Sequence, residues 1–351
     1  MPSAYDSILG HQRPIEQLER ARRLGRVAHA YLFQGPEGVG KERVAFAFAK
    51  ALNCQNPDRA PCDACDSCQR IDRGCHPDVR LVASEEELVR RGLIEPEKGR
   101  SPSRQIRTGQ LDELAGLFRH RPYLGRWKAV VLVDAERMNT SSQNRFLKTL
   151  EEPTDSSVIM LVTAHPDALL PTVRSRCQVV FLGPLGRDDI AAHLEAQQGV
   201  DRERAFILAA MAQGSLGRAE MLADSGFLAL RDEVVGLLSR IRQGDLADLL
   251  SAAGELGEGR DARQRVGDAV GLMEMWCRDL LVLCLCGTAG RERLVNRDRD
   301  ARLAEEAEHA KPRMLLRWIS QIRRTRSALD TNANPRSMIE SLLLQMRTAT
   351  R

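Results

Sequence analysis

Near the start of the chain, apolar residues follow a helical period and then give way to short continuous runs. Residues 14–24 place their apolar side chains on one face of a helix, which Gly25 can end. Residues 30–33 form a short apolar run that leads into a glycine-rich loop, and residues 41–52 return to helical spacing. This order predicts a strand, a loop and a helix, which is the context that a phosphate-binding loop requires.

Two longer apolar runs, at residues 129–133 and 158–162, are rich in β-branched residues. Unbroken runs of this kind are typical of parallel strands that are buried on both faces. A further short run at residues 179–181 adds another strand, so we expect an α/β domain over residues 1–184. The segment 84–105 is charged and contains glycine, proline and serine, and we expect it to form a surface excursion whose role the sequence leaves open.

Beyond residue 184 the strand pattern disappears. Residues 188–223 carry three short amphipathic helix patterns, and longer helical patterns run from residue 226 to the end. Asn334 and Pro335 are suited to the N-cap and the first position of the last helix. We therefore expect two all-helical domains, at residues 185–225 and 226–351.

Composition and charge narrow the class of protein. The chain has 351 residues, which is too many for one ordinary domain. Hydrophobic residues make up 43% and aromatic residues only 4%, so the cores must depend on leucine, alanine and valine, which favours helices. The net charge of +4 is too mild to predict nucleic-acid binding by itself. Residues 1–10 lack the apolar run of a signal peptide, and the longest apolar stretch, near residues 280–286, is too short to span a bilayer.

The glycine-rich loop has the sequence Gly35-Pro-Glu-Gly-Val-Gly-Lys41. Gly35, Gly38 and Gly40 allow backbone N–H groups to turn toward phosphate oxygens, and Lys41 is expected to reach the β and γ phosphates. The next residue is ordinarily serine or threonine, whose hydroxyl holds Mg²⁺, but here it is Glu42. A carboxylate adds negative charge beside a polyphosphate, so the sequence leaves open whether ATP, ADP or no nucleotide binds.

Four of the nine cysteines lie close together, at Cys54, Cys62, Cys65 and Cys68. Four thiolates at this spacing suit a tetrahedral Zn²⁺ ion with no open position, so we expect a structural metal site rather than a catalytic one. Cys75 is an alternative to Cys54 as the fourth ligand. An odd number of cysteines with this clustering also favours a reducing cytoplasm over a disulfide framework.

Two motifs give the chain a specific resemblance. The run from Phe146 to Pro153, Phe-Leu-Lys-Thr-Leu-Glu-Glu-Pro, and the triplet Ser175-Arg176-Cys177 resemble the bacterial clamp-loader ATPases of the AAA+ class, which belong to the DNA polymerase III holoenzyme. Ile8-Leu-Gly10 and His76-Pro-Asp78 extend the likeness. The resemblance implies a P-loop NTPase domain of the AAA+ type with an inserted zinc module at residues 54–68, followed by an all-α lid and an all-α collar.

The same resemblance points to departures from the motor subunit of that family. In the motor, an Asp-Glu pair at a fixed distance before the lysine that aligns with Lys148 binds Mg²⁺ and polarises the attacking water. The corresponding residues here are Val133 and Asp134. Val133 cannot bind a metal, and Asp134 is one methylene shorter than the glutamate. A register shifted by one residue, with Asp134 as metal ligand and Glu136 as base, is the alternative.

A further departure lies in the predicted lid. The motor has Gly-Ser-x-Arg, whose arginine touches the γ phosphate, whereas this chain has Gly214-Ser-Leu-Gly217 with Arg218 one step later. One step on a helix rotates a side chain by roughly 100°, so we expect Arg218 to face solvent. Thr163 still fits the polar sensor position. Together with Glu42 and Val133, these departures imply a subunit that keeps the fold without ATPase or polymerase activity of its own.

In the family, the arginine of Ser-Arg-Cys points at the ATP of the neighbouring subunit. The resemblance therefore makes Arg176 an arginine finger that acts in trans, with Arg174 as a support residue. The implied partners are the motor subunits and the delta subunit of a hetero-oligomeric ring, the sliding clamp, and primed DNA within the complex, in the cytoplasm and without a membrane. Ring stoichiometry and partner surfaces do not follow from the sequence.

Two alternatives remain at this point. The chain could be the ATP-hydrolysing motor subunit, against which Glu42, Val133 and Gly217 argue. It could also be a zinc-stabilised nucleic-acid-binding module with a vestigial nucleotide fold, which binding of primed DNA by the isolated chain would favour.

Overall fold

The computed structural model describes residues 3–97, 99–118, 120–151, 154–224, 226–259, 262–329 and 333–349. These residues form two compact units, one of Met1–His193 with Ala212–Arg218 and the other of Leu194–Met211 with Ala219–Arg351. The three-domain division at residues 184 and 225 stays a prediction. Residues 152 and 153, which end the Phe146–Pro153 motif, lie outside the described residues.

Five strands form one parallel sheet in the order β2-β3-β4-β1-β5. They are β1 (Ala30–Gln34), β2 (Val79–Val82), β3 (Lys128–Leu132), β4 (Ser157–Thr163) and β5 (Gln178–Phe181). The apolar runs at residues 129–133 and 158–162 largely coincide with β3 and β4, which are buried along their whole length. The predicted α/β fold is therefore confirmed.

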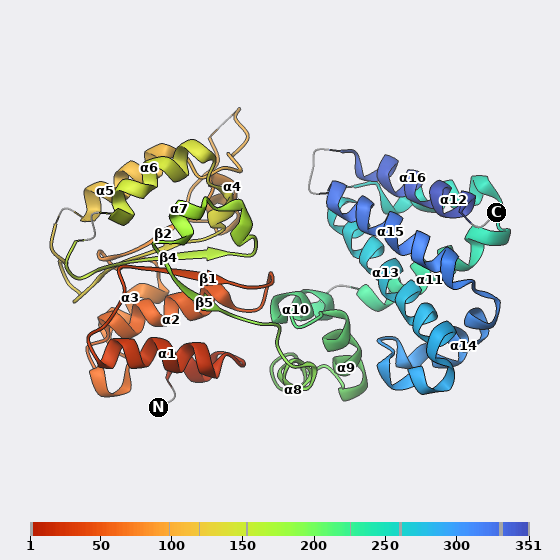
Figure 1. Cartoon of the computed structure of the whole chain (residues 1–351), viewed down its shortest axis with the longest axis horizontal. Helices are drawn as coiled ribbons and strands as arrows, with labels where there is room; N and C mark the ends of the chain where they lie inside the picture. Colours follow the sequence, from red (N-terminus) through yellow and green to blue (C-terminus); the bar gives the residue numbers. More distant parts are fainter. Residues whose placement is uncertain are drawn as a thin grey trace. The chain divides into compact units, whose positions relative to one another are not determined.

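Helices cover both faces of this sheet, with α1, α2 and α3 on one face and α5 and α6 on the other (Figure 1). Successive strand residues point to opposite faces, so Tyr31 packs with Phe48 of α2 while Leu32 packs on the side of Phe146 from α6. The helices of this part are α1 (Gln12–Arg23), α2 (Lys41–Asn53), α3 (Asp66–Asp72), α4 (Glu85–Arg90), α5 (Thr108–Phe118), α6 (Thr140–Glu151) and α7 (Pro171–Arg174). Short 3-10 turns lie at Ala4–Ser7, Pro57–Arg59, Ala135–Arg137 and Pro166–Ala168.

After β5, the described residues form helices and no further strand. These helices are α8 (Arg187–Gln198), α9 (Arg202–Met211), α10 (Leu216–Asp224), α11 (Phe227–Gln243), α12 (Leu246–Leu256), α13 (Ala262–Cys286), α14 (Asp300–His309), α15 (Pro312–Leu329) and α16 (Pro335–Thr348), with 3-10 turns at Gly287–Arg293 and Arg297–Arg299. Asn334 caps α16 as predicted, since its side chain accepts hydrogen bonds from the N–H groups of Arg336 and Ser337. Within the described part of the chain, none of the helices combines the length and the apolar character needed to cross a membrane.

Two buried polar side chains fasten the loop that precedes β3. The Asp78 carboxylate accepts hydrogen bonds from the three consecutive N–H groups of residues 123–125, each at 2.7 Å. Asn53, the last residue of α2, accepts two more from residues 126 and 127, at 2.9 Å each. Burial by itself raises the pKa of Asp78, but the three N–H donors outweigh it and hold the pKa below its usual value.

Asp78→Asn should lower the free energy of unfolding by about 2 kcal/mol at pH 7, because an amide oxygen is a weaker acceptor and its amino group faces N–H donors. Since the folded-state pKa is lowered, this stabilisation is complete above the unfolded-state pKa of about 4 and is lost as the pH falls through the folded-state pKa. Urea unfolding of both proteins from pH 7 downward should therefore show a difference that shrinks below about pH 4.

Asp167→Asn provides the control, because that side chain is 93% exposed and pairs only at the surface with Arg174. It should change the free energy of unfolding by less than about 0.5 kcal/mol. Equal losses in the two variants, or a difference for Asp78→Asn that does not depend on pH, would contradict the assignment.

Candidate functional site

The glycine-rich loop connects β1 to α2, in the order that the sequence predicts. Gly35 follows β1 directly, and Gly38 and Gly40 have φ angles of +70° and +99°, in the left-handed region that glycine adopts without strain. A Cβ atom at Gly38 would lie 2.2 Å from the Ser215 hydroxyl oxygen, so the approach requires glycine. Helix α2 begins at Lys41 and directs the positive end of its dipole toward the loop.

The ammonium group of Lys41 is directed at the loop itself. Its Nζ donates a hydrogen bond to the carbonyl oxygen of Pro36 at 2.7 Å, and the residue is buried. Burial lowers the pKa of Lys41, and the carboxylates of Glu136, Glu37 and Asp134 partly oppose this effect. This contact uses one of the three N–H donors of the ammonium group, so the other two can donate to phosphate oxygens.

The carboxylate of Glu42 is bound by an arginine that the sequence did not single out. Arg91 follows α4, in the charged segment 84–105, and its Nη1 and Nη2 donate to the two Glu42 oxygens at 2.5 and 2.8 Å. Its Nε donates to the buried Glu87 at 2.7 Å. Hydrogen bonding to Glu42 raises the pKa of Arg91 further above its usual value. A guanidinium thus neutralises the residue that stands where a phosphate loop ordinarily presents a hydroxyl to Mg²⁺.

The residues after β3 do not assemble the ligands of a metal. Val133 is 4% exposed and packs in the core on the face covered by α2. Asp134 has a φ angle of +52° and pairs with Arg137 at 3.2 Å, and burial raises its pKa. Glu136 accepts a weak hydrogen bond from the Ala164 N–H at 3.3 Å, while its Oε2 is buried without a partner among the described residues.

Thr163 ends β4 and is buried beside Gln34, the last residue of β1. Because β1 and β4 are parallel, Thr163 and the glycine-rich loop both lie at the carboxyl ends of the strands. Its hydroxyl oxygen accepts a hydrogen bond from the N–H of His165 at 3.0 Å. The structure therefore brings the predicted sensor residue and the predicted phosphate loop to the same end of the parallel strands, and their roles stay predictions.

The segment Gly214–Gly217 lies against the glycine-rich loop. The N–H of Gly217 donates to the carbonyl oxygen of Gly38 at 3.0 Å, and Ser215 accepts a hydrogen bond from the N–H of Arg218 at 3.2 Å. The arginine that the motor would present is absent from position 217, where the backbone itself touches the loop. The side chain of Arg218 is half-buried, so the expectation that it faces solvent is only partly met.

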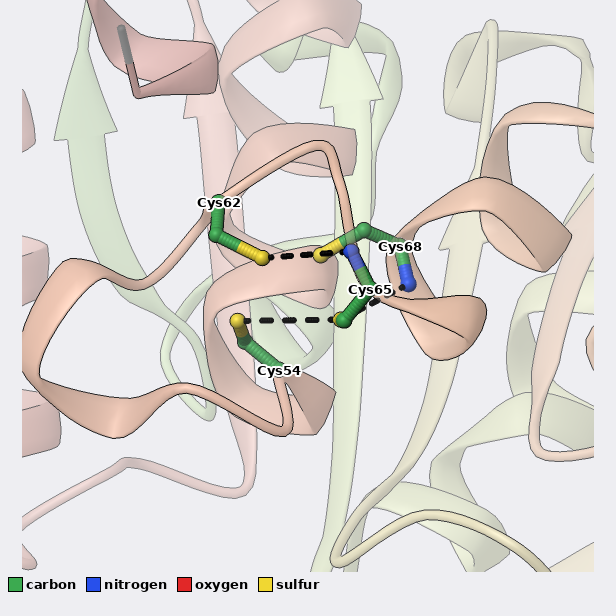
Figure 2. Close-up of side chains that lie close together, drawn as sticks. All are labelled: Cys54, Cys62, Cys65 and Cys68. Carbon is green, nitrogen blue, oxygen red and sulfur yellow. Dashed lines mark hydrogen bonds between the residues drawn. The ribbon is translucent and has the colours of Figure 1, made fainter. Parts of the chain in front are cut away.

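The four clustered cysteines meet between the end of α2 and the start of α3 (Figure 2). Their Sγ atoms all lie within 4.8 Å of one another, and those of Cys54 and Cys65 are 4.0 Å apart. Ligands about 2.3 Å from a tetrahedral Zn²⁺ ion stand about 3.8 Å apart, so the four thiols fit such an ion with little contraction. Cys75 is exposed and donates to the Arg70 carbonyl oxygen at 3.6 Å, outside this cluster.

The thiols differ in how readily they lose a proton. Burial raises the pKa of Cys62, but N–H donors from Ala64, Asn56 and Cys65 outweigh it and lower the pKa to about 6. Burial raises the pKa of Cys68 well above its usual range. A dication would reverse that effect, because it compensates the charge of buried thiolates. The donor set therefore suits a soft divalent metal.

Arg176 lies between α7 and β5, the strand at one edge of the sheet. Its guanidinium donates to Glu151 at 2.6 Å and to the carbonyl oxygen of Thr172 at 2.9 Å, and the side chain is 36% exposed. Arg174 pairs instead with Asp167 at 2.9 Å. Both side chains of the Arg176–Glu151 pair are partly exposed, so the guanidinium is positioned but not enclosed.

Comparison with known proteins links these features to one family. A family model described as "DNA polymerase III, delta subunit" matches residues 10–186. The chain is 26% identical to the DNA polymerase III subunit delta' of Bacillus subtilis over 324 residues, which is 92% of each chain. It is 40% identical to the subunit delta' of Pseudomonas aeruginosa over 151 residues, which are 43% of this chain and 42% of that protein.

A third relative is the DNA polymerase III subunit tau/gamma of Haemophilus influenzae, which is 30% identical over 285 residues, covering 77% of this chain and 38% of that protein. The matches to the Pseudomonas and Haemophilus proteins thus span less than half of those proteins. The resemblance to clamp-loader subunits expected from the two motifs is confirmed, and two of these relatives carry the name delta'. Because the family model covers about half of the 351 residues, this chain belongs to the family described as DNA polymerase III, delta subunit.

Proposed function

We propose that this chain serves as the delta prime subunit of a bacterial clamp loader, a non-motor AAA+ subunit that supports ATP-dependent loading of the sliding clamp onto primed DNA. The observation that carries the proposal is the bidentate pair of Glu42 with Arg91. Arg91 neutralises the charge of Glu42, the residue at the position of one expected Mg²⁺ ligand. At the position of the other expected ligand, Val133 presents an apolar, buried side chain. Phosphoryl transfer depends on Mg²⁺ to offset charge between the β and γ phosphates. The domain therefore keeps the fold of a nucleotide-hydrolysing subunit but lacks the side chains for hydrolysis.

The proposed partners are motor subunits and a delta subunit in a hetero-oligomeric ring, with the sliding clamp and primed DNA bound by the complex. Relatives named delta' and tau/gamma support membership of such an assembly. We place the complex in the cytoplasm, where DNA is replicated in bacteria and where the four thiols stay reduced.

A nucleotide, ATP or ADP, would contact Gly35, Gly38, Gly40, Lys41 and Thr163 if the site is occupied. The loop supplies the backbone N–H groups and the helix dipole for its phosphates. Glu42 lowers the affinity for the metal complex of the nucleotide, because its two carboxylate oxygens are bound by Arg91 and do not coordinate Mg²⁺. Binding of this kind would support the shape of the domain and not drive turnover.

The metal that we assign to Cys54, Cys62, Cys65 and Cys68 is Zn²⁺, in a structural role. Four thiolates leave no open position for a substrate or for water. Cys54 follows α2 and Cys65 caps α3, so the metal would tie the helix behind the glycine-rich loop to the helix that follows it. Removal of a ligand should therefore act on stability.

Purified protein should contain about one Zn²⁺ per chain by elemental analysis. Cys65→Ser should reduce the zinc content and lower the thermal midpoint of unfolding, because a neutral hydroxyl is a poor replacement for a thiolate. Cys75→Ser is the matched control and should keep both values, since this thiol lies outside the cluster. Zinc-free protein from a preparation without chelator, or loss of zinc in the control, would overturn the assignment.

The isolated chain should not hydrolyse ATP above the background of Lys41→Ala, because both positions that would hold Mg²⁺ through protein side chains are altered. Steady-state assays of phosphate release with Mg²⁺ present measure this directly. Turnover by the unmodified chain that disappears in Lys41→Ala would instead identify it as a motor subunit.

Arg176 is proposed to act on the ATP of the neighbouring subunit. Arg176 precedes β5, whereas the glycine-rich loop follows the parallel strand β1, so the two lie at opposite ends of these strands. The effect of Arg176 should therefore appear only after assembly. To reach a neighbouring phosphate it must leave an exposed ion pair, which costs about 1 kcal/mol or less. A planar guanidinium can span two phosphate oxygens, which an ammonium cannot.

Arg176→Ala should leave folding and ring assembly intact and should reduce ATP hydrolysis at the adjacent site by roughly 10³-fold, with a loss of clamp loading. Arg176→Lys should fail in the same way. Arg174→Ala is the control and should matter far less. A reconstituted loader carrying Arg176→Ala that hydrolyses ATP and loads clamps at the unmodified rate would reduce Arg176 to a surface charge.

A further inference from the structure

A groove of about 920 Å³ runs along β2, the strand at the edge of the sheet opposite β5. All four residues of β2 line it. Phe46 and Ile71, from α2 and α3, form one wall, and Leu114 and Leu117, from α5, form the other. Because α2 and α5 cover opposite faces of the sheet, the groove is an open edge held between two layers of helices.

The backbone of this edge has hydrogen-bonding groups to offer. The carbonyl oxygens of Asp78 and Val82 accept hydrogen bonds at 2.8 Å each, from the N–H groups of Ala129 in β3 and of Val133 directly after it. Since alternate residues of a strand direct their backbone groups to opposite sides, the N–H and C=O groups of Leu81 point away from β3 and toward the groove. No residue among those described hydrogen-bonds to them from that side. Such an edge is a template for another strand.

The lining combines apolar surface with uncompensated positive charge. Leu93 and Ile94, at the rim, are 52% and 42% exposed. Arg73, at the end of α3, and Arg80, on β2, are exposed and form no ion pair with any residue that the structure describes. The carboxylate of Asp72, which also lines the groove, is bound by Lys50 at 2.5 Å. Against these two arginines stands a single carboxylate without an ion pair in the described lining, that of Glu113.

We propose that this groove binds an extended segment of a partner protein, which adds to the sheet beside β2. The segment carries apolar side chains interspersed with acidic ones. Its backbone pairs with Leu81, its apolar side chains cover Leu93 and Ile94, and its carboxylates meet Arg73 and Arg80. The inference goes beyond the clamp-loader role and stands independently of it.

The recessed position of β2 favours such a segment over a second copy of this chain. The strand has only four residues and lies between the walls formed by α2 and α5. A second copy would present its own β2 between the same two layers of helices, and the layers would collide before the edges could pair. A single extended segment has no such walls.

The test selects peptides of about ten residues, long enough to cross the edge, from a phage-displayed random library with the zinc-loaded full chain as target. Enriched peptides are synthesised with a fluorescent label and titrated by anisotropy. We expect acidic residues among alternating apolar ones. Arg80→Glu should weaken binding by about tenfold or more, because it reverses a charge on the strand itself. Arg26→Glu, an exposed arginine outside the groove, should change binding by less than about twofold.

A second measurement separates strand addition from mere attraction of charge. In amide hydrogen exchange, a saturating peptide should slow the exchange of the Leu81 N–H, because that group becomes hydrogen-bonded. Failure to enrich any peptide, equal binding to Arg80→Glu, or unchanged exchange at Leu81 would each overturn the proposal. A dimer of the chain that Arg80→Glu dissociates would also overturn it, since the edge would then serve a second copy.

Discussion

The carboxylate of Glu42 lies in the first turn of α2, directly after the glycine-rich loop, and needs a cation. Arg91 supplies that cation and so ties the segment after α4 to the start of α2. Without that guanidinium, the Glu42 carboxylate would have no ion-pair partner among the residues that the structure describes. A bidentate pair of this kind fixes direction as well as charge. It therefore joins the segment 84–105 to the helix that follows the glycine-rich loop, and gives that charged excursion a structural role.

The same pair explains how a phosphate loop can persist without a motor. In an active site, the hydroxyl after the lysine is neutral and Mg²⁺ brings two positive charges. Here Arg90 and Arg91 offset the charges of Glu87 and Glu42, so this group of side chains supplies no surplus positive charge where Mg²⁺ would bring two. Lys41 meanwhile satisfies the Pro36 carbonyl oxygen, which leaves the loop folded without depending on a ligand. Selection on shape alone would keep these contacts.

The cysteine cluster and the groove beside β2 are parts of one construction. Cys65 caps α3 through the N–H of Cys68, and the other end of that helix supplies Ile71 and Arg73 to the groove. The helix spans only Asp66–Asp72, which is too short to be stable on its own, so its position depends on what holds its first turn. A metal at the cluster would fix this wall of the groove. The zinc module would in this way shape a surface as well as stabilise a domain.

Much of the fold followed from the sequence, because the signals concerned are local. Unbroken apolar runs predicted β3 and β4, the glycines predicted the turn before α2, and Asn334 predicted the start of α16. The spacing of the four cysteines predicted a cluster that the structure contains. Each of these features depends on residues within a few positions of one another, where periodicity, backbone preference and side-chain spacing act directly.

Only the tertiary structure decided which distant groups meet. Arg91 and Glu42 are 49 positions apart, and Asp78 binds N–H groups 45 to 47 positions away, so no local pattern indicates either contact. The same holds for the edge of β2, whose openness depends on the order of all five strands and on where two layers of helices end. Sequence determines such contacts through the packing of the whole sheet, since a charged side chain has many partners of opposite sign and the fold selects among them.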